Sequence, residues 1–94
     1  MTRLRTHPGE VLRDEYLVPL GLSARALAKE LDVPANRLTE IMRGVRDVTA
    51  DTAIRLGRYF GTDPRFWLNL QAAYDLSKAE KAHSYTKIVR RKAA

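Results

Sequence analysis

Apolar residues recur at helical spacing in five segments of the chain, and glycine, proline or a capping residue separates each segment from the next. The expected helices run from His7-Pro8-Gly9-Glu10 to Pro19-Leu20-Gly21, from Ser23 to Leu31, from Pro34 to Arg43, from Thr49 to Gly61, and from Pro64 to about Glu80. Only the segment from Tyr85 to Val89 alternates in the manner of a strand. The pattern therefore predicts an all-α fold, a single five-helix domain over residues 1–80 followed by a short basic C-terminal tail over 81–94.

The second and third helices have the lengths of a helix-turn-helix pair, about residues 23–43, in which one helix enters the major groove of DNA. In the third helix an apolar stripe of Leu38, Ile41 and Met42 faces inward, so the polar side chains lie on the opposite face. The candidates for contact with DNA bases on that face are Asn36, Thr39, Glu40 and Arg43. Asparagine suits adenine, arginine suits guanine, glutamate can accept from cytosine, and threonine offers a hydroxyl and a methyl group. Glu40 has an alternative role, because its charge opposes phosphate and it can instead orient an arginine.

Three residues beside this face are better placed for the phosphate backbone than for bases: Ser23, Arg37 and Arg46. Ser23 begins the second helix, where free N–H groups can hold a phosphate. Arg37 flanks the polar face, and Arg46 follows the third helix on the loop. The alternative interpretation is that all these residues are ordinary surface positions of a helical bundle.

The last two helices supply much of the expected interior. The fourth is expected to line the core with Ala53, Ile54, Gly57 and Phe60. The last helix carries two apolar stripes, one of Phe66, Trp67, Leu70, Ala73 and Tyr74, the other of Leu68, Ala72, Leu76 and Ala79. We expect one stripe to close the core and the second, Leu68, Ala72, Leu76 and Ala79, to meet the same helix of a second subunit in a homodimer. The alternative is that the tail wraps this helix.

The net charge of +6 comes almost entirely from the tail, because residues 1–80 hold 12 basic and 11 acidic residues. The tail can be a flexible arm that adds phosphate affinity, or a segment that orders on a partner protein. Glu10, Asp14 and Glu15 form an acidic patch on the first helix, which is either a solvated face or an attraction for a basic partner.

The composition leaves little room for an enzyme, a metal site or a membrane protein. The chain has no cysteine, and its two histidines, His7 and His83, lie far apart in the sequence. His7, which precedes a proline, is expected to be a turn or capping residue. No glycine-rich phosphate loop, apolar span or signal segment is present, so we expect no cofactor, no metal, no catalytic residue, no membrane contact and a cytoplasmic protein.

Four stretches of the chain form a distinctive combination: His7-Pro8-Gly9-Glu10, Ala26-Leu27-Ala28-Lys29-Glu30-Leu31, Asp51-Thr52-Ala53-Ile54-Arg55-Leu56 and Phe66-Trp67-Leu68-Asn69-Leu70-Gln71. Together they resemble the HigA family (VapI-like) of helix-turn-helix antitoxins. The similarity runs in order from about His7 to Glu80, and the combination of the first and last stretches is its most specific part. One departure is Asp32, which stands in the turn where many helix-turn-helix proteins have glycine; aspartate tolerates left-handed backbone better than most residues.

The resemblance implies a lambda-repressor-like domain whose recognition helix spans Ala35 to Arg43. It also implies a dimer that binds a palindromic, double-stranded operator, represses its own operon and neutralises a RelE/HigB-like toxin that cleaves messenger RNA on the ribosome. The alternative function is a stand-alone helix-turn-helix repressor with no toxin partner. The two share every expected DNA contact.

Overall fold

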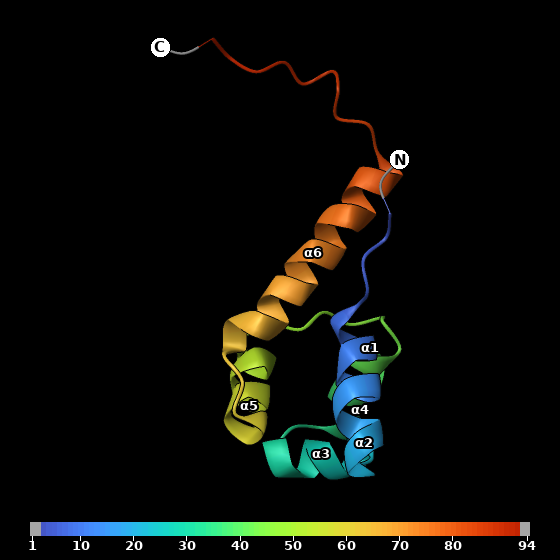
Figure 1. Cartoon of the computed structure of the whole chain (residues 1–94), viewed down its shortest axis with the longest axis vertical. Coiled ribbons are helices and arrows are strands. Elements are labelled where there is room, and N and C mark those ends of the chain that lie inside the picture. The colour runs from blue at the N-terminus through green and yellow to red at the C-terminus, as the bar shows by residue number, and fades with distance from the viewer. Residues whose placement is uncertain (1–2, 93–94) are drawn as a thin grey trace.

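The computed structural model describes residues 3–92, and within them every regular element is a helix (Figure 1). The first helix is continuous and consists of α1 (Pro8–Val11), the π-helical η1 (Leu12–Leu17) and α2 (Val18–Leu20). It is followed by α3 (Ala24–Leu31), α4 (Ala35–Met42), α5 (Ala50–Phe60) and α6 (Pro64–Ala82). The predicted all-α fold is confirmed; residues 1, 2, 93 and 94 of the predicted domain and tail lie outside the described residues.

The π-helical turn in the first helix has a clear cause in Pro19. A proline inside a regular α-helix lacks the N–H donor, and its ring clashes with the carbonyl four residues earlier. In η1 the turn is widened, so that the Val18 N–H donates to the carbonyl of Arg13, five residues earlier. Gly21, with φ of 61°, then ends the helix in the left-handed conformation.

Most of the helices begin at the capping residues that the sequence predicts. The Ser23 hydroxyl accepts the Ala26 N–H at 3.0 Å, and the Asp63 carboxylate accepts the Arg65 N–H at 2.8 Å. Nδ1 of His7 accepts the Gly9 N–H at 2.9 Å, which confirms a capping role for this histidine. The helix α4 begins at Ala35, one residue later than expected, because Pro34 has extended backbone and occupies the N-cap position.

The core lies where the five helices meet, and its largest fully buried side chains include Leu12, Leu38, Leu56 and Trp67. One expectation for this core is wrong: Ile54 is 52% exposed, whereas Leu56, which the sequence pattern omitted, is buried. The reason is the orientation of α5. This helix packs against α6 and α3, and its buried face contains Ala53, Leu56 and Gly57, whereas Ile54 lies about a quarter of a turn away from that face.

The N-terminal end of the described chain lies near the C-terminal end of α6, and the tail extends from there away from the helices (Figure 1). The N-terminal arm, Arg3–Thr6, runs beside α6, and the backbone N–H of Arg5 donates to the Ser77 hydroxyl at 2.9 Å. All residues of the tail from His83 to Lys92 are exposed. The alternation of Tyr85 to Val89 does not produce a strand; the Ile88 N–H instead donates to the Tyr85 carbonyl and closes a turn.

Candidate nucleic-acid interface

The polar face of α4 is presented to solvent as the helical wheel predicts. Leu38 and Ile41 are completely buried, and Met42 is half-buried against the core. Asn36, Thr39 and Arg43 are exposed on the other side of the same helix. An exposed polar face on a helix with a buried apolar stripe is what contact with base edges in a major groove requires.

The turn between α3 and α4 depends on Asp32. Its φ of 58° and ψ of 49° are left-handed, and no other residue besides glycine in the described part of the chain has a positive φ. The Val33 N–H donates to the Ala28 carbonyl at 3.0 Å, and the Arg55 guanidinium donates to the Leu31 carbonyl at 2.7 Å. Asp32 therefore adopts the left-handed conformation that glycine usually provides at the end of a helix. The hydrogen bond from Arg55 connects α5 to the end of α3.

Asp51 forms two ion pairs, one that connects α4 to α5 through Arg37 and one within α5 with Arg55. The Asp51 carboxylate accepts from the Arg37 guanidinium at 2.6 Å and from the Arg55 guanidinium at 2.9 Å. The hydrogen bonds from Arg55 and Arg37 lower the pKa of Asp51 below its usual value. Because a guanidinium has five N–H donors, Arg37 retains donors that a phosphate can use. Sequence reasoning missed Asp51 and Arg55, although their spacing of four residues in one helix is a signal for such a pair.

Glu40 and Arg46 form a second ion pair, with Nη2 of Arg46 lying 2.8 Å from the Glu40 carboxylate. This geometry corresponds to the alternative role of Glu40, in which it orients an arginine. Arg46 and Arg37 line one hollow of 360 Å³ beside the N-terminus of α5, together with Asp47, Thr49, Asp51 and Thr52. The structure thus brings two of the three predicted phosphate contacts together. Ser23 does not line this hollow and uses its oxygen to cap α3.

The C-terminal end of α4 rests directly on the first helix at Gly9. A Cβ atom at this position would lie 1.9 Å from the carbonyl oxygen of Ile41 and 2.9 Å from Cα of Met42. Only glycine allows the two backbones to approach so closely. His7 completes the junction: its ring meets the Tyr74 ring edge to face at 4.8 Å, and burial lowers the pKa of His7 although the nearby carboxylates oppose this shift.

The loop from α4 to α5 is held by the buried side chain of Gln71. Its Oε1 accepts the backbone N–H of Val48 at 2.7 Å, and its Nε2 donates to Asp75 at 2.9 Å and to Asp47 at 3.2 Å. Arg46 lies on this loop, so α6 helps to place a predicted phosphate contact. The sequence pattern did not single out this role for Gln71.

The two stripes of α6 have different surroundings. Trp67 is completely buried, and Leu70, Ala73 and Tyr74 are half-buried, whereas Phe66 is 38% exposed. In the second stripe Leu76 is 64% exposed and Ala72 is exposed, and Ala79 and Leu68 are half-buried, with Leu68 packed against the core. The contact of this stripe with a second subunit stays a prediction.

Within residues 3–92, no helix has both the length and the apolar character needed to cross a membrane. The same residues contain no group of histidine and carboxylate side chains suited to a metal ion.

The chain is similar to helix-turn-helix proteins of known sequence and structure. Residues 14–67 match the model of a helix-turn-helix family. The chain is 63% identical over 75 residues to virulence-associated protein I of Dichelobacter nodosus, which covers 80% of this chain and 69% of that protein. A Pseudomonas aeruginosa protein in complex with its 18-bp operator DNA superposes with a TM-score of 0.90 and 44% identity, over 97% of this chain and 100% of that one. The antitoxin HigA of Pseudomonas aeruginosa, solved with the higBA promoter, gives a TM-score of 0.80 and 51% identity over 82% of this chain and 84% of that chain.

The fold, the recognition helix and these matches define a helix-turn-helix DNA-binding protein, a class of transcription regulators and antitoxins and not of enzymes. Within this class the chain belongs to the HigA family of antitoxins, as the four stretches of its sequence predict.

Proposed function

We propose that this protein is the antitoxin of a type II toxin–antitoxin pair, which binds operator DNA as a homodimer, represses its own operon and neutralises a toxin that cleaves messenger RNA. The observation that carries the DNA-binding part is the exposed polar face of α4, flanked by Arg37 and Arg46 beside the N-terminus of α5. The antitoxin part is supported by the similar Pseudomonas aeruginosa protein that is named antitoxin HigA, and the structure of that protein with the higBA promoter supports the DNA-binding part.

In the proposed complex Asn36, Thr39 and Arg43 contact base edges, and Glu40 contributes either to a base or by orienting Arg46. Arg37, Arg46 and Ser23 contact phosphates. The ion pairs of Arg37 and Arg46 with carboxylates restrain the two guanidiniums before DNA arrives, so less side-chain freedom is lost on binding.

Two arginine substitutions separate base contact from phosphate contact. Replacing Arg43 with alanine should cost about 1–3 kcal/mol on the operator and relax specificity at one position. Replacing Arg37 with alanine should weaken all DNA sequences alike and reduce the salt dependence by about one phosphate contact. The matched control is Arg65→Ala, because Arg65 has a side chain 83% exposed at the start of α6, outside this interface. Fluorescence anisotropy with operator and scrambled duplexes measures both quantities; if Arg43→Ala and Arg37→Ala both bind as the parent does, the groove assignment is wrong.

The dimer is proposed to form through the second stripe of α6, Leu68, Ala72, Leu76 and Ala79. Two recognition helices in such a dimer can read half-sites about 34 Å apart on one face of the duplex. Replacing the exposed Leu76 with arginine should give a monomer in light scattering without loss of helix content, since this side chain is 64% exposed in the single subunit. A dimer that persists in this variant would exclude this stripe.

Co-purification tests the toxin partner. The tagged protein is expressed from its own operon, and proteins that accompany it are identified by mass spectrometry. We expect to recover a small basic protein that stops growth when it is released from the tagged protein. This small protein should also cleave messenger RNA in a translation extract. Recovery of the protein alone, as a dimer that still binds its own promoter, would leave the stand-alone repressor as the function.

A further inference from the structure

The C-terminal tail combines apolar and basic side chains that its own chain does not cover. Ile88 is 76% exposed and Val89 is 85% exposed, and Tyr85 is 47% exposed. The basic residues of the same segment are Lys87, Arg90, Arg91 and Lys92. A solvated phosphate-binding arm needs only the charges, so consecutive exposed isoleucine and valine indicate a protein surface as the binding partner.

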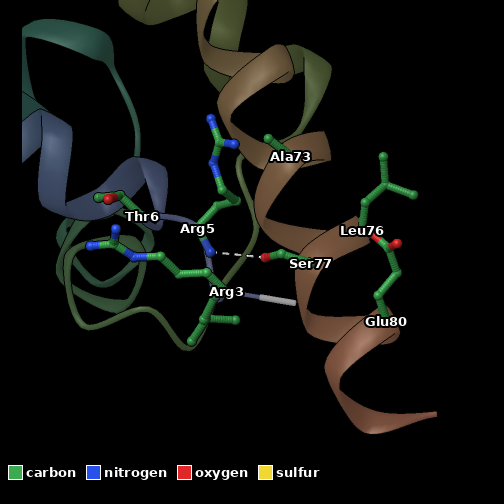
Figure 2. Close-up of a pocket in the computed structure, with 8 residues that line it drawn as sticks. Arg3, Arg5, Thr6, Ala73, Leu76, Ser77 and Glu80 are labelled. Carbon is green, nitrogen blue, oxygen red and sulfur yellow. Dashed lines mark hydrogen bonds between the residues drawn. The ribbon is translucent and has the colours of Figure 1, made fainter. Parts of the chain in front are cut away.

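A surface suited to the tail lies between the N-terminal arm and α6. The hollow shown in Figure 2 has a volume of 590 Å³ and is lined by one side of α6, Ala73, Leu76, Ser77 and Glu80, and by the arm. The Arg5–Ser77 hydrogen bond fixes the arm, while Leu76 and Glu80 project from α6 away from that bond (Figure 2). Leu4, which is 43% exposed, and Leu76 are the two large apolar side chains that line this hollow.

This hollow continues into a second one of 500 Å³ between the arm, the first helix and α6, because Arg5, Thr6 and Ala73 line both. The second hollow contains Glu10, Asp14 and Glu15. Together the two hollows present four carboxylates and only two guanidiniums, those of Arg3 and Arg5, although Asp14 is also paired with Arg13. A surface with apolar contacts and an excess of negative charge complements a tail with apolar and positive side chains.

We propose that this continuous surface, the arm–α6 groove, receives the tail of a second copy of this chain. The inference rests on the proposed dimer, since packing of α6 against its partner places the start of one tail beside the other helix. Residues 84–92 extend about 30 Å at about 3.3 Å per residue. The 19 residues of α6 span about 28 Å, so the tail is long enough to follow the helix of the partner.

Cysteine cross-linking between differently tagged chains tests the exchange, because the parent has no cysteine. One chain carries Ala73→Cys in the groove, and the other carries Ile88→Cys in the tail. The two are co-expressed at full length and treated with an oxidant or a short bismaleimide. We expect a covalent dimer that contains both tags. The matched control pairs Ile88→Cys with Val18→Cys, because Val18 is 68% exposed and lies outside both hollows.

A second variant measures what the tail contributes. Replacing Ile88 and Val89 with serine should raise the dimer dissociation constant about tenfold or more, which corresponds to the burial of roughly one apolar side chain. The salt dependence of operator binding should stay unchanged, since no phosphate contact is removed.

The outcomes separate this inference from the proposed function. A parent dimer whose mixed-tag cross-link is no stronger than the Val18 control overturns the tail exchange and leaves the dimer intact. A dimer dissociation constant that is unchanged when Ile88 and Val89 are replaced with serine also overturns it, because these two side chains then contribute nothing to the contact between the subunits. A parent that is monomeric at all concentrations overturns both the exchange and the proposed dimer.

Discussion

Replacing Gly9 with alanine tests the contact on which the position of the recognition helix depends. The added Cβ would lie 1.9 Å from the Ile41 carbonyl oxygen and 2.7 Å from its carbon, and both are backbone atoms that no rotamer change can move. Ordinary contact begins at 3.4 Å, so the first helix and the end of α4 must separate by about 1.5 Å. Overpacking of this kind costs about 1–3 kcal/mol, or more where backbone must shift. Because backbone must shift here, we take the upper end of this range, about 3 kcal/mol; alanine gains about 0.5–1 kcal/mol over glycine within a helix, so we expect a net loss of about 2–2.5 kcal/mol.

The assay is urea unfolding followed by the fluorescence of Trp67, the single tryptophan of the chain, with all variants at one protein concentration. At about 1.5 kcal/mol per molar urea, the midpoint should fall by about 1.3–1.7 M. Operator affinity should fall as well, beyond the loss of folded protein, because Ile41 and Met42 belong to the recognition helix.

The matched control is Gly21→Ala. Gly21 has a φ of 61°, but a Cβ atom added there meets no atom within 4 Å. The only expected cost of the substitution is therefore that of holding an alanine in the left-handed conformation, about 1–2 kcal/mol of folding free energy. This control should leave operator affinity per folded molecule unchanged. If Gly9→Ala retains parent-like operator binding and loses no more than about 0.5 kcal/mol, the two helices do not approach as described.

Three further substitutions test individual contacts. Asp32→Ala should cost about 1 kcal/mol of folding free energy because Asp32 is left-handed, whereas Asp32→Gly should be tolerated; equal urea midpoints for both variants would contradict the strained turn. Gln71→Leu should cost about 1–3 kcal/mol, because the Val48 N–H loses its acceptor, and exchange of that amide with deuterium should accelerate; unchanged protection would refute the contact. Burial lowers the pKa of His7 below its usual 6.5, so the unfolded chain binds a proton that the native state does not, and stability should fall as the pH decreases below about 6.5. His7→Asn, which can still cap the Gly9 N–H, should flatten this part of the pH dependence; an identical pH profile in parent and variant would assign the effect to another group.

Local sequence signals are sufficient to predict where the helices lie and which face of α4 is exposed. Capping side chains such as Ser23 and Asp63 act within one turn of their own helix, so their positions in the chain identify the helix starts. The stripe of Leu38 and Ile41 has a fixed period, which determines the opposite, exposed face containing Asn36 and Arg43.

Contacts between distant residues could not be predicted in this way. The burial of Leu56 in place of Ile54 follows from how α6 lies on α5, and a helical wheel shows only the angle between residues, not the side that a neighbour covers. The Arg37–Asp51 pair joins residues 14 positions apart, and the Gln71–Val48 bond joins residues 23 positions apart. Such bonds exist only after the helices have packed.

The sequence by itself determined the five helices, their caps, the left-handed turn at Asp32 and the polar face of the recognition helix, because each depends on residues within one or two helical turns. Only the tertiary structure decided which charges of that face are already paired, that Gly9 sets the distance between the first helix and α4, and that the arm and α6 form a groove. These features arise where segments far apart in the chain meet, and short-range hydrophobic periodicity contains no information about which segments those are.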